Sequence, residues 1–569
     1  MFNLFNHNYY YWILKVKNYL KKAYNTGILF IFILLVACNN AVSPPTAAVS
    51  TRASVSPSNS KYFIISSFAD AINLNPLVAS DGASHEIIDF VYDRLIDLDE
   101  EKNPLPHIVS SWKVSPDGKT WTFTVKKGIK WHDGVPLTAE DIVFTIESMR
   151  NPRVNCPYSS RFDLVKKVEL LDKYKFRLTL RETYAPFLTL LAYVSPVPKH
   201  LLENWDPSDM RNSPISRKPV GTGPYKFVEW ASGEHIVLTR NPDYWKEKYH
   251  IDGVYFKVVP SQDTQFVQIK TGEIDILDGL TPEQYIQLQK ESTNQINLYR
   301  YLSSYYCYMG INLKCELFKD KKVRQALAYA INKRVITDKL LKGFATPAYS
   351  PIYPTMKKWH NKNVRKYEYD PQKARQLLKQ AGWSFNKRKG YYERNGKLFE
   401  FTLTTNKGNP VREKMLVIIQ QNLREVGIKV TPKILEWSIF LKRVDQGKMD
   451  AWILAWGGGS LDPDSITYSN FLSNRTPQQG GHNYSYYSNP QVDELLTKAR
   501  ETMDTEKRKK LYFRFQEIIA EDLPMIFIYY RDNLVAVNKR IIIPKGAEPY
   551  EGTVFHHFER WSIEQKLVP

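Results

Sequence analysis

An apolar run that ends at a cysteine divides this chain into a short leader and a long remainder. The run GILFIFILLVA covers residues 27–37, four lysines lie between residues 15 and 22, and Cys38 follows the run directly. The run is shorter than the about 20 apolar residues that span a bilayer. A short apolar run after a basic stretch and before small residues is typical of a signal segment that is removed. We therefore expect the folded part of the protein to lie after Cys38.

The residues Leu35, Val36, Ala37 and Cys38 resemble the bacterial lipobox. The resemblance implies cleavage before Cys38 and acylation of its thiol, so the mature protein would be held on the extracytoplasmic face of a membrane, in the periplasm or at the cell surface. Residues 1–37 are then a lipoprotein signal peptide, and residues 38–60, rich in Ser, Pro and Ala, are a flexible tether. The alternative is a signal anchor with an incidental cysteine.

The remainder is too long for a single hydrophobic core. A chain of 569 residues is expected to form two or three packed regions. With 43% hydrophobic residues and a mean hydropathy of −0.42, we expect globular regions and no later membrane-spanning segment. The net charge of +20 favours anionic lipid headgroups as a partner. Nucleic acid is not expected, because the basic residues are scattered and accompany no recognised binding motif.

Three cysteines remain after Cys38. Cys156, Cys307 and Cys315 are an odd number and cannot all pair within one chain. Outside the cytoplasm a local bridge between Cys307 and Cys315 is one alternative, and a buried unpaired thiol is the other. None of them has the spacing of a cysteine metal site.

Short strand patterns alternate with helical patterns from Lys61 onward. The runs YFIISS (62–67), WTFTVKK (121–127) and FRLTLRE (176–182) predict strands, and residues 321–336 and 371–383 carry apolar residues at helical spacing. Asp370 and Pro371 predict a helix start, and Gly382 predicts its end. Pro116, Asp117 and Gly118 predict a tight turn between two strands. The alternation predicts α/β lobes.

Several segments resemble, in order, the family 5 extracellular solute-binding proteins, which are the dipeptide and oligopeptide receptors of ABC importers. They are residues 90–146 (FVYDRLIDLDEEKNPLPHIVSSWKVSPDGKTWTFTVKKGIKWHDGVPLTAEDIVFTI), GTGPYKFVEW (221–230), LTRNPDYW (238–245), IKTGEIDI (269–276), VRQALAYAINKRVI (323–336), YDPQKARQLLKQAGW (369–383) and DLPMIFIYYRDNLVAV (522–537). Each segment alone is weak, but their number and order identify the family from Lys61 to the C-terminus. The GTGP motif is interpreted as a turn, because it lacks the lysine and helix of a phosphate loop.

The resemblance implies the two-lobed periplasmic-binding-protein fold of the large peptide-binding type. Lobe I would comprise residues 61–300 with 527–569 returning to it, and lobe II residues 301–526. Two segments, near 298–302 and 524–530, would cross between the lobes. The implied function is that of a monomeric receptor, which captures peptides, most simply oligopeptides, between the lobes and delivers them to permease subunits. Hinge closure would signal to the transporter that a ligand is bound. Family members also bind nickel complexes, haem, oligosaccharides or cell-wall peptides, so these remain alternatives.

The resemblance also implies ligand contacts in residues 435–465. Trp437 and Trp456 occupy positions at which related proteins have an aromatic side chain facing the ligand. Gly457, Gly458 and Gly459 follow, at positions where the backbone of such a receptor pairs with the peptide. Glycines allow such close approach, although a plain flexible turn is the alternative. Peptide receptors commonly carry an aspartate at the position of Gly459, which holds the peptide's α-ammonium group. Asp462 is nearby, but Asp462-Pro463 is typical of a helix start, so we interpret Asp462 as a helix cap.

Further candidates lie in lobe I. The loop 79–85, with Ser84, corresponds to a ligand-facing loop of relatives, and Tyr158 stands where relatives present a tyrosine to the peptide. Arg161 is a candidate for binding a ligand carboxylate, although a surface ion pair is the simpler expectation.

Catalysis finds little support in the sequence. It contains no GxSxG elbow, no HExxH zinc pair and no lysine-bearing phosphate loop. His482 and the pair His556-His557 are isolated, and we interpret them as structural groups. We expect neither cofactor nor metal site. The alternative from another class is an exported, lipid-anchored hydrolase, which would cleave a peptide that a receptor returns intact.

Overall fold

A computed structural model describes residues 61–291, 295–457, 462–550 and 554–564. The predicted signal peptide, the predicted lipidation site Cys38 and the predicted tether therefore lie outside the described residues, as do Gly458 and Gly459. Among the described helices, none is both long and apolar enough to cross a membrane.

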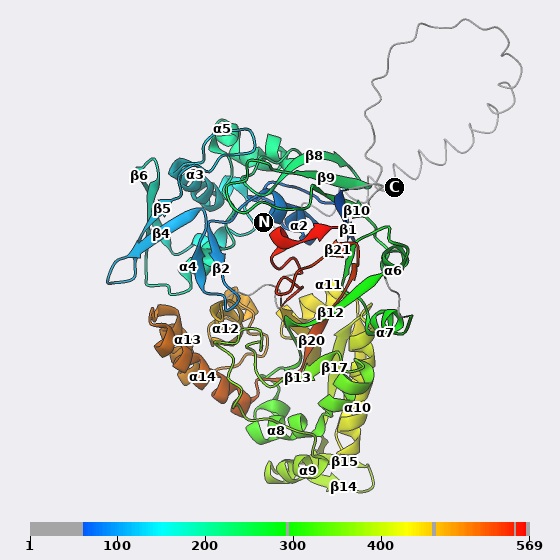
Figure 1. Ribbon diagram of the computed structural model, residues 1–569. Coiled ribbons are helices and arrows are strands. Elements are labelled where there is room, and N and C mark those ends of the chain that lie inside the picture. The colour runs from blue at the N-terminus through cyan, green and yellow to red at the C-terminus, as the bar shows by residue number, and fades with distance from the viewer. Residues whose placement is uncertain (1–60, 292–294, 458–461, 551–553, 565–569) are drawn as a thin grey trace, which may run out of the picture. The chain divides into compact units, whose positions relative to one another are not determined.

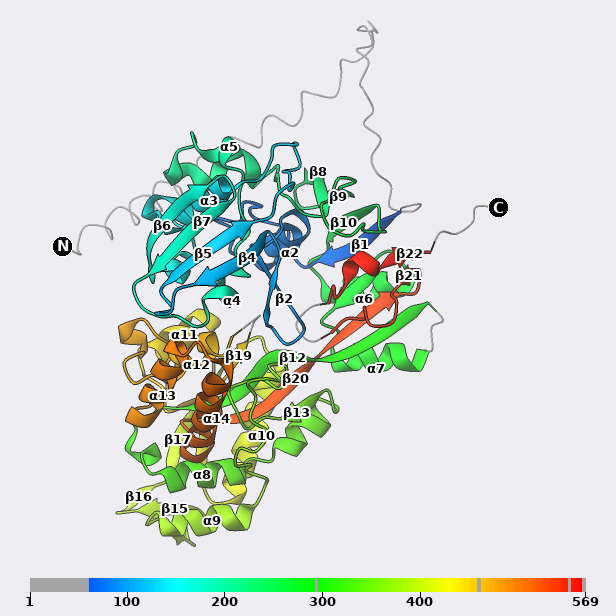
Figure 2. The same ribbon diagram turned by 60° about the vertical axis from the view of Figure 1, so that its left-hand side comes forward.

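One large mixed sheet runs through the described part of the protein (Figures 1 and 2). Its strands, in sheet order, are β18 (Lys429–Leu435), β17 (Glu400–Asn406), β19 (Ala451–Gly457), β12 (Ile296–Ile311), β20 (Met525–Asn538), β11 (Ile276–Asp278), β1 (Tyr62–Ser67), β10 (Gly253–Val258), β9 (His235–Arg240) and β8 (Tyr225–Ala231), with β13 (Ala345–Pro347) pairing with β20. A second sheet has the order β4 (Val109–Val114), β5 (Thr120–Val125), β7 (Lys175–Leu180) and β6 (Val165–Asp172).

Shorter strands complete the β-structure. They are β2 (Ile96–Leu98) with β3 (Pro104–Pro106), β14 (Ser384–Asn386), β15 (Tyr391–Arg394) and β16 (Lys397–Leu398), and β21 (Ile541–Ile542) with β22 (Ser562–Ile563).

Helices cover the sheets. They are α2 (Gly82–Val91), α3 (Ala139–Arg150), α4 (Phe187–Leu191), α5 (Lys199–Leu202), α6 (Gln262–Thr271), α7 (Pro282–Glu291), α8 (Lys321–Ala330), α9 (Pro371–Gln380), α10 (Pro410–Glu425), α11 (Trp437–Asp445), α12 (Asp464–Phe471), α13 (Pro490–Glu501) and α14 (Thr505–Asp522). A short 3-10 turn, η3, covers Ser159–Phe162, and another, η9, covers Phe558–Arg560.

Separate cores define the two lobes. Lobe I surrounds a core that includes Phe63, Trp121 and Trp561, so the C-terminal segment packs with the first strand. Lobe II holds two adjoining cores, one on each side of its part of the sheet, represented by Met309 and by Trp452. This arrangement agrees with the predicted two-lobed α/β fold.

Two long strands link the lobes. β12 and β20 pair antiparallel from Ile296–Asn538 to Gly310–Met525, with register shifts after Leu302 and Cys307. The Val535 end of β20 lies in the lobe I core and the Ile526 end in a lobe II core. Figure 2 shows both strands crossing from one lobe to the other. The residue limits given above for the lobes stay predictions, because these strands belong to both.

Local sequence signals explain several elements. Asp370 caps α9 by accepting from the Lys373 amide, and Gly382 after the helix has φ +80°. Gly118, at φ +70°, lies in the turn between β4 and β5, where its amide donates to the Ser115 carbonyl at 2.9 Å. These predictions are confirmed. The helix expected over 321–336 instead ends at Ala330, and a π-helical segment follows at Val335–Leu340.

The GTGP segment is a close-packed turn, as expected. The Gly223 amide donates to the Val91 carbonyl at 2.9 Å, and a Cβ added to Gly221 would lie 1.9 Å from the same oxygen. The amide of Gly223 is therefore already bonded, and the glycines serve the packing of α2 against the start of β8.

Candidate ligand-binding site

A cavity of 610 Å³ lies between the two lobes. Lobe I lines it with residues of η3 and with the segment from Glu182 to Tyr193, which contains α4. Lobe II lines it with α12 and with Arg475 and Arg500. In both ribbon views α4 faces α12 across this boundary (Figures 1 and 2). Both lobes therefore shape the cavity, which is the arrangement expected for a site that closes around a ligand.

A buried carboxylate joins the lobes at this cavity. The hydroxyl of Tyr184 in lobe I donates to Asp464 at 3.0 Å, and Arg500 donates to both oxygens of the same carboxylate at 3.1 and 3.0 Å. The Ala185 amide donates to the Arg500 carbonyl at 2.8 Å. Burial and the Asp464 charge raise the pKa of Tyr184 well above its ordinary value, so this hydroxyl remains a donor.

Arg161 lies between two aromatic rings on the lobe I side. Its guanidinium carbon is 4.2 Å from the ring centroid of Tyr158 and 4.8 Å from that of Tyr193. Among the described residues no carboxylate forms an ion pair with it, so the simpler expectation of a surface ion pair is wrong. Arg161 also lines a neighbouring cavity of 230 Å³. A cation without a carboxylate partner is suited to bind an anionic group of a ligand.

Tyr158 and His85 connect this arginine to the loop 79–85. The Tyr158 hydroxyl and His85 Nε2 are 2.7 Å apart, and burial lowers the pKa of His85 below its ordinary value. Ser84 is fully buried, and its Oγ accepts from the amides of Ile72 and Asn73 at 2.9 and 3.1 Å. The Ser84 side chain therefore holds the loop in place, while His85 lines the smaller cavity.

The candidates of lobe II lie at the end of β19 and the start of α11. Trp456 pairs with Tyr306 across the sheet, and its ring is 5.0 Å from that of His482. Gly457 is exposed, and a Cβ there would lie 2.7 Å from the Ser304 carbonyl, so the neighbouring strand already requires a glycine. Trp437 is 47% exposed and stacks on Phe440. None of these three residues lines the 610 Å³ cavity.

A link nevertheless exists between Trp456 and this cavity. His482, beside Trp456, has its Nδ1 2.8 Å from the Ser469 hydroxyl, and Ser469 lines the cavity. The structure thus places Arg161 in the wall of the 610 Å³ cavity and Tyr158 beside it in the wall of the 230 Å³ cavity. Trp456 is separated from the wall residue Ser469 by His482.

Asp462 has a partner that the sequence did not indicate. Its carboxylate accepts two bonds from Arg508, both at 2.6 Å, and a third from the Asp464 amide at 2.9 Å. The last bond agrees with the interpretation of Asp462 as a residue that caps α12. No sequence signal relates Asp462 to Arg508, because the pair depends on the packing of α14 beside α12.

The three described cysteines are unpaired. Cys307 is buried in β12 and lies 3.3 Å from the Leu454 carbonyl, whereas Cys315 lies 3.7 Å from Asp450. Burial raises the pKa of Cys307 to about 11, so this thiol stays protonated. Of the two alternatives, the structure shows the buried thiol.

Comparisons with known proteins agree with this architecture. The family described as "Bacterial extracellular solute-binding proteins, family 5 Middle" matches residues 103–478. The oligopeptide-binding protein AppA of Bacillus subtilis is 32% identical over 94% of this chain and 97% of its own length. Its structure with a nonapeptide has a TM-score of 0.70 and covers 88% of this chain and 99% of that chain.

Relatives with other ligands are also similar. NikZ from Campylobacter jejuni in complex with Ni(L-His) is 31% identical, with a TM-score of 0.71, over 88% of this chain and 99% of that chain. The heme-binding protein A of Haemophilus influenzae is 28% identical over 90% of this chain and 94% of its own length. The scaffold therefore accommodates chemically different ligands.

Proposed function

This chain belongs to the family 5 bacterial extracellular solute-binding proteins, and we propose that it captures peptides between its two lobes and delivers them to the permease subunits of an ABC importer. The single observation that carries the proposal is the cavity between the lobes, with the cation of Arg161 in its wall, for which the described residues provide no carboxylate partner. A peptide has a carboxylate at its C-terminus, and a guanidinium binds carboxylates through paired hydrogen bonds. The similarity to AppA, whose structure holds a nonapeptide, supports an extended oligopeptide.

We assign the proposed contacts as follows. Tyr158 and Arg161 hold an anionic group, and Ser84 positions the loop that presents His85. Trp437 and Trp456 are proposed to contact peptide side chains, and Gly457 to Gly459 to pair with the peptide backbone.

The usual anchor for the amine end of the peptide is missing. Gly459 replaces the aspartate of the family pattern. Asp462 and Asp464, the nearest described carboxylates in this stretch, are already paired with Arg508 and Arg500. We therefore propose that the peptide's N-terminus is not read by a buried charge, so blocked or longer peptides are accepted.

Isothermal titration with matched free and N-acetylated nonapeptides tests this proposal. A charge-assisted contact is worth about 1.5–3 kcal/mol, or roughly 10- to 150-fold in affinity. Without such a contact the two peptides should bind within about tenfold of each other. Trp456→Ala should weaken both equally. A larger preference for the free amine that Asp462→Asn abolishes would show that Asp462 is the anchor.

A nickel–histidine complex is the second candidate ligand. His482 lies beside Trp456, and partial burial of its ring lowers its pKa, so the imidazole is neutral and able to bind a metal. The Ser469 bond at Nδ1 leaves Nε2 for coordination. Titration of Ni²⁺ with L-histidine present should then give binding that His482→Gln removes, and peptide should compete with it.

We propose further that the protein is a monomeric lipoprotein, attached through Cys38 on the extracytoplasmic face of the membrane, and not an enzyme. Fatty-acid labelling should be lost in Cys38→Ala, and equal labelling of this variant would contradict the anchor. A peptide incubated with the protein should be recovered intact, whereas cleavage products would support the alternative of an exported hydrolase.

A further inference from the structure

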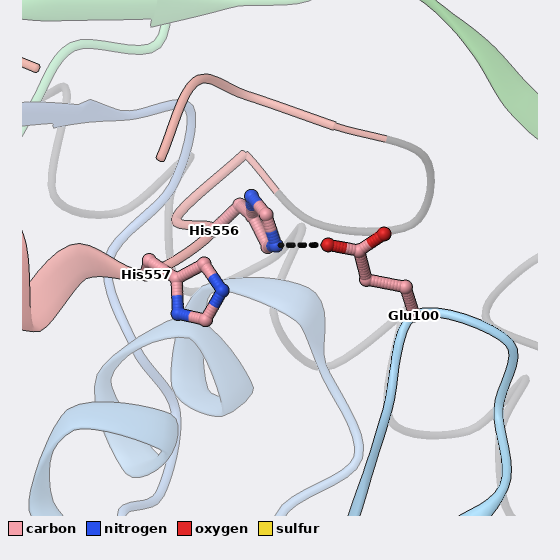
Figure 3. A group of neighbouring side chains, drawn as sticks. All are labelled: Glu100, His556 and His557. Carbon is pink, nitrogen blue, oxygen red and sulfur yellow. Dashed lines mark ion pairs between the residues drawn. The ribbon is translucent and has the colours of Figure 1, made fainter. Parts of the chain in front are cut away.

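Three side chains with metal-binding atoms meet in lobe I, away from the interlobe cavity. They are Glu100, in the turn between β2 and β3, and the adjacent His556 and His557, just before η9. One ligand atom from each lies within 4.8 Å of those of the other two. Figure 3 shows the carboxylate of Glu100 pointing toward His556, whose Nε2 is 3.7 Å from it.

Packing of the C-terminal segment creates this cluster. Phe558 and Trp561 lie in the lobe I core, and the Phe558 ring packs against those of Phe63 and Phe90 at centroid distances of 5.3 Å. This anchoring carries the two histidines to the β2–β3 turn, more than 450 positions from them in the sequence. The residues were interpreted above as isolated because nothing in the sequence predicts this contact.

The second nitrogen of each ring has a suitable acceptor. Nδ1 of His557 lies 2.9 Å from the Glu559 carboxylate, which leaves Nε2 available. The His556 ring lies near the backbone of Glu548, while its Nε2 faces Glu100. Metal-bound histidines almost always donate their other ring N–H to a carboxylate or a backbone carbonyl in this way. The cluster therefore has both the ligand atoms and the supporting bonds of a metal site.

We propose that Glu100, His556 and His557 bind one divalent transition-metal ion of the nickel, copper and zinc group. Imidazole nitrogens with a carboxylate oxygen suit these ions rather than Ca²⁺ or Mg²⁺, which prefer oxygen ligands. With bonds of about 2.0–2.2 Å, ligand atoms around a tetrahedral zinc ion stand about 3.4 Å apart. The Glu100–His556 pair, at 3.7 Å, is near this separation, and the exposed Glu100 side chain is able to rotate toward His557. A water or a solute would occupy the fourth position.

The proposed metal site also lies close to residues that contact lobe II. Asn103, in the same turn as Glu100, accepts from Lys358 of lobe II at 2.9 Å, and Tyr550 is hydrogen-bonded to Lys357 and lies beside His556. An ion at the cluster would hold the β2–β3 turn and the C-terminal segment together where both contact lobe II. We therefore expect it to stabilise this side of the interlobe boundary.

The test is titration of the full chain with Zn²⁺ alone. The protein carries no histidine tag, is purified in detergent, is stripped of metal and is free of added histidine. We expect one equivalent to bind saturably, and His556→Gln with His557→Gln to abolish it. Glu559→Gln, which removes only the supporting carboxylate, should weaken Zn²⁺ binding by about 10- to 100-fold. Co²⁺ substitution should give the visible absorption of a site with imidazole ligands.

A matched control tests whether the two histidines act specifically. His250→Gln, on an exposed loop, should leave Zn²⁺ binding unchanged. The double histidine variant should keep its peptide affinity and its circular dichroism, which shows that it is folded. Full Zn²⁺ binding by the folded double variant, or loss of binding in His250→Gln, would overturn the proposal without affecting the proposed peptide function.

Discussion

At the scale of single residues, charged side chains that are buried in the protein have the clearest consequences for stability and for ligand binding. The Lys333 side chain is only 6% exposed, and its Nζ donates to the Ala348 carbonyl at 2.9 Å and lies over the ring of Tyr349. Burial lowers its pKa to about 7, against a partial opposing effect of Glu368. Asp462 and Arg508 are buried as a bidentate pair, whereas Arg161 has aromatic neighbours in place of a carboxylate. Lys333 and the Asp462–Arg508 pair therefore affect stability, whereas Arg161 is a candidate for contacting the ligand.

Lys333→Met should change the pH dependence of stability. In the folded protein the pKa of Lys333 is about 7, against about 10.5 when unfolded, so between these values the unfolded chain binds more protons. The contribution of Lys333 to the free energy of unfolding therefore rises with pH from about 7 to 10.5 and is lowest below pH 7. Urea unfolding across this range should show a rise in the parent that is smaller in the variant. Parallel profiles would contradict the lowered pKa.

Asp462→Asn should reduce stability without changing ligand affinity in the same proportion. The variant leaves the buried Arg508 cation without its carboxylate, and removing one partner of a buried ion pair typically costs about 3–5 kcal/mol. Glu517→Gln is the control, because its pair with Arg514 is exposed on both sides and should contribute less than about 1 kcal/mol. Equal unfolding midpoints for the two variants would show that the Asp462 pair is not structural.

At the scale of elements, close backbone contacts explain why several segments must pair as they do. Gly221 and Gly223 let the start of β8 approach the end of α2. Gly310 in β12 would, with a Cβ, meet the Trp452 ring at 2.1 Å, so that β12 and β19 pack tightly beneath the lobe II core. Such contacts tie elements together independently of the hydrophobic pattern.

Gly221→Ala should destabilise lobe I. The added methyl would collide with the Val91 carbonyl, which is backbone and cannot rotate away, and overpacking of this kind costs about 1–3 kcal/mol or more. Gly82→Ala, at the first position of α2, has open space around the new methyl and should be neutral or stabilising by up to about 1 kcal/mol. The unfolding temperatures of the two variants test this prediction. An unchanged unfolding temperature of Gly221→Ala would mean that the turn relaxes to accept the methyl group.

At the scale of the whole molecule, individual hydrogen bonds connect the lobes at separate places. Tyr184 and Ala185 of lobe I bond to Asp464 and Arg500 of lobe II at the cavity, whereas Asn103 bonds to Lys358 and Tyr550 to Lys357 elsewhere. Separate bonds of this kind suit a joint that opens and closes, because each contributes only about 1 kcal/mol. Small changes at this boundary therefore alter the fraction of molecules that are closed and ready to bind.

Tyr184→Phe should weaken peptide binding while leaving each lobe intact. Loss of one interlobe hydrogen bond to a carboxylate should reduce affinity by up to about tenfold, because the closed state becomes less populated. Tyr349→Phe is the matched control, since it removes a tyrosine–carboxylate bond to Glu368 within lobe II. Small-angle scattering with and without peptide should show a smaller change of radius in Tyr184→Phe. An unchanged peptide affinity of Tyr184→Phe would show that the Tyr184–Asp464 bond does not contribute to closure of the lobes.

The sequence by itself determined the family, the α/β class, and the local turns and helix starts. The Pro116–Gly118 turn and the Asp370 cap follow from the conformations that a few adjacent residues prefer, so a short stretch is enough to predict them. Only the tertiary structure placed Asp462 beside Arg508, Arg161 between Tyr158 and Tyr193, and Glu100 beside the two histidines. These contacts join segments that are distant in sequence. They form because the cores and the lobes pack together, and the conformational preferences of short stretches do not predict that packing.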